Sequence, residues 1–338
     1  MNNTPCAIAL FSGGLDSILA CRVIASQGIR VQAVKFVTPF FDYDLLQKQE
    51  EYQDTVLTKF GIHVIVRDIT QPYLKLLIKP PHGFGKNFNP CVDCKILMVH
   101  NAVEMMKDFN ASFIITGEVL GQRPMSQRKD TLRVIERDSL TDGILLRPLC
   151  AKRLPPTQPE IDGIVDREKL LSFSGRGRSQ QIELAKSFGI TDYPSPAGGC
   201  TLTDPNLSKR IKAYYQEKEV ISADDIRFLL IGRQFRLPDG GWLSLGRDEN
   251  ENIQITKLYI DGDILLNDDE WPGPTALLRH SSTPENIKLA AGLVARFGKK
   301  KPIGQEKCEI TITIDTKETV LSVLPLEDEI FSPWQLTA

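Results

Sequence analysis

The sequence predicts an α/β fold, in which a doubly wound parallel sheet is joined to a second, smaller α+β domain. Two observations support this prediction. Strand-like and helix-like patterns alternate through the first half of the 338-residue chain, and short elements of a different texture follow Cys200. Alternating strands and helices are typical of a parallel sheet that helices cover on both faces.

The first half supplies the elements of the parallel sheet. Short apolar runs predict strands at residues 7–11, 31–37, 63–68 and 113–116. Amphipathic stretches predict helices at residues 17–27, 44–60 and 94–108. The Pro- and Gly-rich stretch 79–90 is predicted to be a loop, and it lies directly before a pair of cysteines.

The second half predicts mixed elements. Helices are expected at residues 179–188, 207–215, 223–231 and 286–296. Strands are expected at residues 242–245, 258–260, 264–266 and 308–314. The change of texture predicts a boundary near residue 205, which gives a first domain over residues 1–205 and a second over 206–338.

Composition restricts the class of protein but not its function. Hydrophobic residues make up 41% and charged residues 25%, as in ordinary globular domains. No apolar run approaches the roughly 20 residues that span a bilayer, and the N-terminus lacks the parts of a signal peptide. We therefore expect a cytoplasmic protein without membrane contact. The net charge of −2 does not indicate a nucleic-acid binder, so any RNA affinity must come from local basic patches.

A glycine-rich hexapeptide, Ser-Gly-Gly-Leu-Asp-Ser, lies at residues 12–17 between the first predicted strand and helix. Gly13 and Gly14 permit tight turns, so successive amides can converge on an anion in front of the helix N-terminus. Asp16 suits a magnesium ion that bridges it to phosphate oxygens. The alternative is a plain turn in which Asp16 or Ser17 caps the helix. The complete hexapeptide at this position favours a phosphate loop that includes Ser12 and Ser17.

Seven cysteines are present, and only Cys91 and Cys94 are close together in sequence. A CxxC pair can be a redox pair, half of a zinc site, or part of an iron–sulfur site that another cysteine completes. The sequence has no second CxxC, and Cys200, in a Gly- and Pro-rich turn, is the best third candidate. Three thiolates on a 4Fe–4S cluster would leave one iron open for sulfide. The other four cysteines are expected to be small core residues: Cys6, Cys21, Cys150 and Cys308.

The hexapeptide resembles the Ser-Gly-Gly-x-Asp-Ser loop of the PP-loop ATP pyrophosphatases, which have an adenine nucleotide α-hydrolase-like fold. Three further motifs occur in the order seen in the tRNA 4-thiouridine synthase family. They are Cys-Val-Asp-Cys-Lys at 91–95, Thr-Gly-Glu-Val-Leu-Gly-Gln at 116–122, and Leu-Arg-Pro-Leu at 146–149. The resemblance covers roughly residues 6–200. It implies ATP-dependent adenylation of a tRNA uridine, followed by replacement of the carbonyl oxygen by sulfur.

The resemblance also implies roles for individual residues. Asp16, Cys94, Cys200 and Arg147 are expected to be catalytic, and Cys91, Cys94 and Cys200 to hold the cluster. The ATP and Mg²⁺ site would consist of loop residues and of residues in the second strand and the second motif: Ser12, Gly13, Gly14, Asp16, Ser17, Phe36, Thr116, Gly117 and Gln122. The partners implied are tRNA and sulfide or another sulfur donor, and a homodimer is a further option.

Some features depart from the family. Its N-terminal RNA-binding extension and its rhodanese domain have no counterpart in the sequence, so we expect sulfur to arrive as free sulfide. A lysine that usually follows the Arg-Pro-Leu motif is displaced by an insert at 151–174, and Arg178 falls at its place. Segments at 232–236, 246–252 and 272–274 are similar to the RNA-binding domain of the NFACT family. Alternatives that remain are 2-thiouridine synthesis at the wobble position, amidation of a small molecule, persulfide chemistry at Cys94 and Cys200, and a non-enzymatic RNA-binding protein.

Overall fold

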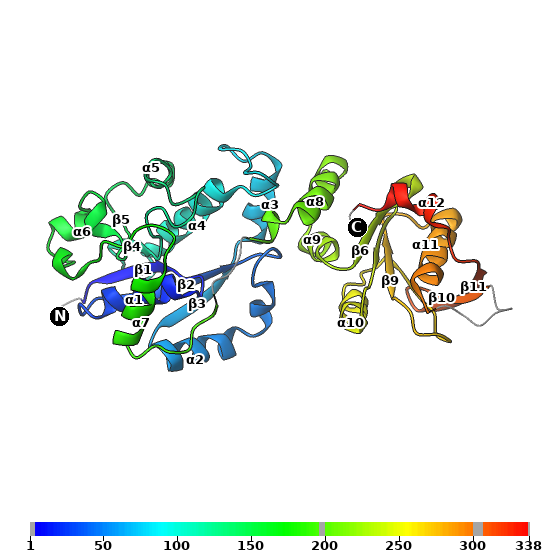
Figure 1. Cartoon of the computed structure of the whole chain (residues 1–338), viewed down its shortest axis with the longest axis horizontal. Helices are drawn as coiled ribbons and strands as arrows, with labels where there is room; N and C mark the ends of the chain where they lie inside the picture. The colour runs from blue at the N-terminus through cyan, green and yellow to red at the C-terminus, as the bar shows by residue number, and fades with distance from the viewer. Residues whose placement is uncertain (1–3, 196–199, 300–306, 337–338) are drawn as a thin grey trace. The chain divides into compact units, whose positions relative to one another are not determined.

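The computed structural model describes residues 4–195, 200–299 and 307–336 and divides the chain into two compact units (Figure 1). The first unit comprises Met1–Thr201 and the second Leu202–Ala338. The division thus falls beside Cys200, slightly before the expected boundary at 205.

The first unit contains a parallel sheet of five strands in the order β3-β2-β1-β4-β5. The strands are β1 (Cys6–Leu10), β2 (Arg30–Val37), β3 (His63–Asp68), β4 (Phe113–Thr116) and β5 (Leu145–Leu146). This arrangement confirms the predicted α/β class. Leu10 is in register with Thr116 of β4, so the segments that leave these two strands start side by side.

Helices cover both faces of this sheet (Figure 1). On one face lie α1 (Leu15–Ala25), α2 (Gln49–Phe60) and α7 (Ser179–Ser187), and on the other α4 (Cys91–Met106) and α5 (Lys129–Asp138). Because side chains alternate along a strand, Ala7 and Ala9 pack in the core on the side of α1, α2 and α7, and Ile8 and Leu10 pack in the core on the side of α4 and α5. Further short helices are α3 (Thr70–Ile78) and α6 (Gln158–Ile161).

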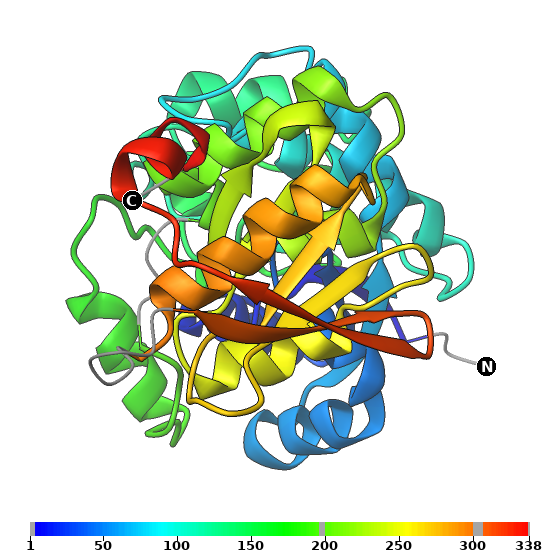
Figure 2. The same cartoon turned by 90° about the vertical axis from the view of Figure 1, so that its right-hand side faces the viewer.

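The second unit contains a six-stranded antiparallel sheet in the order β11-β10-β8-β9-β7-β6. Its strands are β6 (Arg233–Arg236), β7 (Trp242–Leu245), β8 (Ile264–Asn267), β9 (Ala276–Arg279), β10 (Cys308–Ile314) and β11 (Lys317–Val323). Its helices are α8 (Pro205–Glu217), α9 (Ala223–Leu230), α10 (Glu249–Lys257), α11 (Pro284–Phe297) and α12 (Asp328–Phe331). Figure 2 shows α11, drawn in orange, crossing one face of the sheet, where its alanine-rich side is buried.

Two sequence predictions about these elements are wrong. The predicted strand 258–260 follows directly on α10, and the Leu258 amide closes that helix by donating to the Ile255 carbonyl (3.0 Å). Three apolar residues are too few to distinguish a strand from a helix end. The second error concerns α4, which was expected from residue 94. It begins at Cys91, because the Cys94 amide donates to the Pro90 carbonyl (2.7 Å), so both cysteines lie in its first turn.

Within the residues described, every helix is too short or too polar to cross a bilayer.

Candidate active site

The phosphate loop connects β1 to α1 at the carboxyl edge of the parallel sheet, where ligands of such folds bind. Gly13 has a φ of +81°, a left-handed conformation that side chains disfavour. Gly14 is extended and forms the N-cap of α1 without a side-chain cap. The loop therefore presents backbone amides, and the alternative that Asp16 or Ser17 caps the helix does not describe this turn.

The two serines of the loop hold its shape. Ser12 Oγ donates to Ser17 Oγ (3.2 Å) and accepts from the Gly14 amide (3.3 Å). Ser17 Oγ in turn donates to the Gly14 carbonyl (2.8 Å). Both hydroxyls can exchange these contacts for phosphate oxygens, because a hydroxyl can act as donor and acceptor.

Asp16 lies in the first turn of α1, and its side chain is 18% exposed. Its Oδ2 accepts from Gln122 Nε2 (2.7 Å) and lies 3.7 Å from an Arg178 guanidinium nitrogen. Its Oδ1 is buried and has no hydrogen-bond partner among the described residues. A buried carboxylate oxygen without a partner is costly, and a hard cation such as Mg²⁺ would satisfy it. The geometry at Asp16 therefore fits a magnesium ligand.

The segment after β4 packs directly on the phosphate loop. A Cβ atom placed on Gly117 would lie 2.6 Å from the Asp16 backbone, so only glycine fits there. Gln122 joins the two segments through Asp16, and its Oε1 accepts from Gln181 of α7 (3.2 Å). Thr116 is buried, and its hydroxyl donates to Glu118 (3.1 Å). The structure thus brings the hexapeptide at 12–17 and the motif at 116–122 together.

Lys35 and Tyr52 also border the phosphate loop, although the sequence analysis did not select them. Lys35, near the end of β2, is 5% exposed and donates from Nζ to the Ser12 carbonyl (2.6 Å). It also pairs with Asp42 (2.5 Å). The Tyr52 hydroxyl from α2 lies 3.2 Å from the position that a Cβ would occupy on Gly13. Neither residue belongs to a motif, so only the fold reveals their proximity.

The structure gathers the three selected cysteines around Tyr73. Cys94 is deeply buried, and this burial raises the pKa of its thiol to about 12, with smaller contributions from nearby groups that include Cys200 and Cys91. Burial also raises the pKa of Tyr73, with smaller contributions from the same three sulfurs, and the Tyr73 hydroxyl is hydrogen-bonded to Cys94. No three His, Cys, Asp or Glu side chains in the described parts of the chain are arranged as ligands of a metal ion.

Two further side chains shape the cysteine site. Asn89 Nδ2 donates to Cys91 Sγ (3.1 Å), and hydrogen bonds of this kind tune thiolate ligands. Thr201, next to Cys200, donates from Oγ1 to the Phe40 carbonyl (2.9 Å), and the Phe40 ring packs 5.7 Å from Tyr73. These contacts connect the segment around Cys200 to the surroundings of Cys94.

Arg147 lies in the interior rather than on an open surface. Its side chain is 0% exposed and forms ion pairs with Glu118 (3.0 Å) and Glu136. Burial raises the pKa of Glu118, but Lys95 and Arg147 outweigh it and hold that pKa below its usual value. Lys95 Nζ is 3.9 Å from Glu118, whose Oε1 has no hydrogen-bond partner among the described residues. The carboxylate of Glu118 thus links the residue after Cys94 to Arg147.

Phe36 and His82 occupy contrasting places. Phe36, on β2, is 5% exposed and belongs to the core between the sheet and α4.

His82, in the loop before α4, bridges Asp93 (2.7 Å) and Asp138 (2.9 Å). The hydrogen bond from Asp93 is the main cause that raises the pKa of His82. Because Asp93 lies between Cys91 and Cys94, His82 ties the loop to the start of α4.

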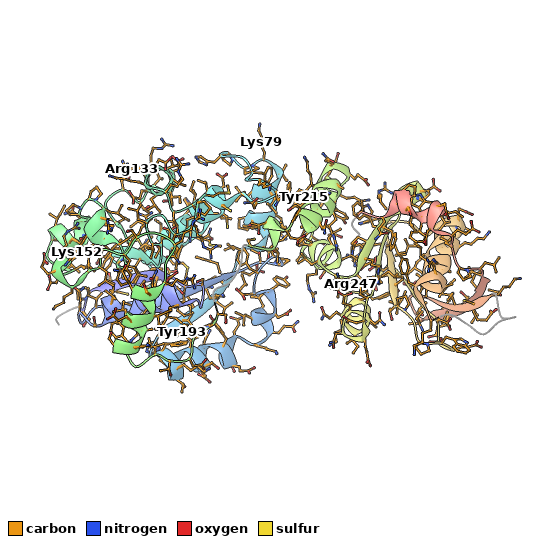
Figure 3. All side chains as sticks on the ribbon, in the orientation of Figure 1. Lys79, Arg133, Lys152, Tyr193, Tyr215 and Arg247 are labelled. Atoms are coloured by element: carbon orange, nitrogen blue, oxygen red, sulfur yellow. The ribbon has the colours of Figure 1, made fainter. Side chains whose placement is uncertain are left out.

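The arginines within the segments similar to the NFACT domain have intramolecular partners. Arg233 lies over the Phe297 ring (4.9 Å), and Arg236 pairs with Glu217 (2.7 Å). Arg247, labelled in Figure 3, pairs with Glu251. Ion-paired arginines on a surface can still contact phosphates, because exposed pairs are weak.

Asn252 explains the glycine and asparagine pattern of this unit. Its Nδ2 donates to the Gly273 carbonyl (3.1 Å), and its Oδ1 accepts from the Thr275 amide (2.9 Å). A Cβ on Gly246 would lie 2.1 Å from Asn252 Oδ1, so only glycine leaves space for this side chain. Asn252 therefore holds the segments 246–252 and 272–275 together.

Comparison with known proteins gives two family matches. Residues 4–153 match the family described as thiamine biosynthesis protein (ThiI), and residues 232–335 match the NFACT protein RNA binding domain. A probable tRNA sulfurtransferase from Lysinibacillus sphaericus is 27% identical, over 42% of this chain and 34% of that protein. One from Ureaplasma urealyticum is 29% identical, over 68% of this chain and 53% of that protein.

A crystal structure of a 4-thiouridine synthetase–RNA complex with bound ATP aligns with a TM-score of 0.39 and 24% identity, over 55% of this chain and 41% of that one. The chain spans between a third and about half of the length of the two relatives above. The first unit is thus similar to the ThiI family and to tRNA sulfurtransferases, and the second unit is similar to the NFACT RNA-binding domain.

Proposed function

We propose that this chain is an ATP-dependent tRNA sulfurtransferase that converts a uridine to 4-thiouridine. The observation that carries the proposal is the phosphate loop, which brings together the N-terminus of α1, two serine hydroxyls and an Asp16 Oδ1 that has no hydrogen-bond partner among the described residues. The similarity of residues 4–153 to the ThiI family and the names of the relatives support it.

In the first step, the uridine carbonyl oxygen attacks the α-phosphorus of ATP. A bond forms between that oxygen and phosphorus, the bond to the β-phosphate oxygen breaks, and pyrophosphate leaves. The amides of the loop and the hydroxyls of Ser12 and Ser17 would stabilise the departing charge. Asp16 would hold Mg²⁺, which neutralises charge on the phosphates when bound.

In the second step, sulfide attacks the activated carbon of the base. A carbon–sulfur bond forms, the carbon–oxygen bond to AMP breaks, and AMP leaves, so the step needs no oxidant. Cys91, Cys94 and Cys200 are the residues that would serve this step. Their thiol chemistry and the hydrogen bonds from Tyr73 and Asn89 fit a 4Fe–4S cluster, which would supply a binding site for sulfide.

The second unit would hold the tRNA. Its similarity to an RNA-binding domain supports this role, and exposed basic residues such as Arg247 offer phosphate contacts. If phosphates are contacted, tRNA affinity falls as the salt concentration rises.

Nucleoside mass spectrometry of tRNA treated with the protein, ATP and sulfide tests the proposal. We expect 4-thiouridine, together with AMP and pyrophosphate in equal amounts. Finding only 2-thiouridine would support ATP-dependent thiolation but would place it at the 2-carbonyl of the uridine instead of the 4-carbonyl. Absence of any ATP-dependent thiolated nucleoside, with pyrophosphate released in the presence of a small acceptor and ammonia, would instead favour an amidating synthetase.

A further inference from the structure

A buried lysine beneath the phosphate loop has no role in the reaction described so far. Lys35 is 5% exposed, and burying an ammonium is costly unless it is paired and hydrogen-bonded. Lys35 meets this cost with two partners, the Asp42 carboxylate (2.5 Å) and the Ser12 carbonyl (2.6 Å). Asp42 balances its charge, so the pair adds little net field at the loop. What distinguishes Lys35 is the direct hydrogen bond to the loop backbone.

That hydrogen bond determines where the next amide points. Ser12 C=O and Gly13 N–H belong to one planar trans peptide, in which the two groups point in opposite directions. A carbonyl held by Lys35 therefore directs the Gly13 N–H away from Lys35. No acceptor for the Gly13 N–H is recorded among the described residues, so this donor is available to a ligand.

The side of the loop that faces Lys35 is closed. A Cβ on Gly13 would meet the Tyr52 hydroxyl at 3.2 Å and Lys35 Nζ at 3.9 Å, so both groups stand against the same side of Gly13. A ligand can approach the loop only from elsewhere. The Gly13 N–H points away from this closed side.

We infer that Lys35 is a positioning residue of the phosphate loop, which holds the Ser12 carbonyl so that the Gly13 amide faces the pyrophosphate group of the nucleotide. The inference rests on the proposed function and deepens it. Lys35 acts through the Ser12–Gly13 peptide and does not contact the phosphates. Without it, the peptide can rotate, and one amide donor to the anion is lost.

Four variants of the full-length chain separate this role from a purely structural one. Lys35→Met removes the ammonium and keeps the length of the side chain, whereas Lys35→Gln keeps an N–H donor for Ser12. Asp42→Asn removes the counter-charge and leaves the contact between Lys35 and Ser12. Lys59→Met is the matched control, because it breaks an exposed ion pair with Asp192 (2.7 Å) in the same unit.

The probe is inorganic pyrophosphate with Mg²⁺, with binding measured by calorimetry and folding checked by thermal unfolding. A lost hydrogen bond to a charged ligand should make binding by Lys35→Met about tenfold weaker or more. Lys35→Gln should recover part of this loss. Asp42→Asn and Lys59→Met should stay within about twofold of the parent protein. In turnover assays, KM for ATP should rise more than kcat falls.

The outcomes distinguish the inference from the proposed function. If the parent protein binds pyrophosphate and folded Lys35→Met binds it equally well, the inference is wrong and the proposed function stands. If Asp42→Asn weakens binding as much as Lys35→Met, the ion pair matters and the carbonyl contact does not, which also overturns the inference. If the parent protein binds neither pyrophosphate nor ATP, both fail. Should Lys35→Met not fold, the comparison of Lys35→Gln with Asp42→Asn decides.

Discussion

The phosphate loop and the cysteine site lie in the same unit but are built in different ways. The loop is one continuous segment, and its shape follows from the left-handed Gly13, from hydrogen bonds among residues 12–18 and from the tight contact with Gly117. The cysteine site combines the first turn of α4 with Cys200, more than one hundred residues later in the chain. Among the described residues, Tyr73 contacts both segments, and Thr201 anchors the second one to the Phe40 carbonyl.

The phosphate loop therefore has its shape before a ligand binds, whereas we expect the cysteine site to reach its final geometry only when its ligand binds. Hydrogen bonds among residues 12–18 already hold the backbone of the loop in shape, so a ligand would need only to exchange contacts of the Ser12 and Ser17 hydroxyls. The three cysteines, by contrast, are near one another but are not arranged as metal ligands in the described residues. Bringing thiolates into final geometry as a group binds is common where metal binding is coupled to local ordering. Substitutions should therefore affect the two sites differently.

The largest effect is expected for Asp16→Ala. Removing the carboxylate should lower pyrophosphate formation at least about 100-fold, because phosphoryl chemistry depends on charge stabilisation at this point. The fold should persist, since Asp16 lies in a first helical turn at the sheet edge. Asp44→Ala, an exposed acidic residue of the same unit, is the control. Normal pyrophosphate release by folded Asp16→Ala protein would contradict a role of the phosphate loop in ATP cleavage.

The next effect separates the two sites. Changing Cys91, Cys94 or Cys200 to Ala should abolish thiolation and leave ATP binding intact, because the loop does not depend on these side chains. Protein purified without oxygen should be brown with about four irons per chain, and each of these variants should lose the colour. Cys21→Ala, a buried cysteine of α1, should keep both properties. Colourless, iron-free protein that still thiolates tRNA with sulfide would favour a persulfide at Cys94 and Cys200.

In both units, loss of a buried ion pair is expected to lower the free energy of unfolding. Arg147→Met leaves Glu118 buried without its main partner, and Arg279→Met does the same to Asp263 in the second unit. Removal of one member of a buried ion pair costs about 3–5 kcal/mol, so both variants should unfold at markedly lower denaturant concentration. Arg133→Ala removes an exposed partner of Asp142 (Arg133 is labelled in Figure 3) and should cost less than about 1 kcal/mol. Equal effects of Arg133→Ala and Arg147→Met would contradict this interpretation.

The smallest effect concerns pH. The pKa of His82 is raised in the folded state, chiefly by its hydrogen bond to Asp93, so the folded protein holds the proton more tightly than the unfolded chain does. The resulting stabilisation is fully present below the ordinary pKa of 6.5 and is lost as pH rises through the raised value. Because the site is partly open to solvent, the change should be below about 1 kcal/mol. His82→Gln should abolish this pH dependence of the unfolding free energy, and an unchanged slope would exclude His82 as its source.

The elements that sequence reasoning found are those with a strong local pattern. The four predicted strands β1 to β4 are confirmed: β1 and β4 are buried at every residue, as expected inside a parallel sheet, whereas β2 and the edge strand β3 are partly exposed. Strand β5 has two residues, and β11 is exposed over most of its length, so neither carries a periodic apolar signal. Helix α3 was missed because it has only nine residues and contains Pro72, a residue that is disfavoured in helix interiors.

The site shows a similar limit. Residues in contiguous motifs, such as Gly117 and Gln122, were selected, and their contact with Asp16 explains their spacing. Lys35, Tyr52 and Tyr73 were not selected, because their roles arise from contacts between segments that are distant in sequence. Arg147 was selected from its motif, but nothing in the sequence reveals that its side chain is buried and paired with two carboxylates.

Because Gly117 has no side chain, the segment after β4 lies directly against the Asp16 backbone, and Gln122 ties the two segments together by its hydrogen bond to Asp16 (2.7 Å). Glu118 follows Gly117, and its carboxylate lies 3.9 Å from Lys95 Nζ. Lys95 directly follows Cys94. Five residues, Asp16, Gly117, Glu118, Lys95 and Cys94, thus form a continuous connection from the phosphate loop to the cysteine pair, and we expect a shift of one segment to be transmitted to the other.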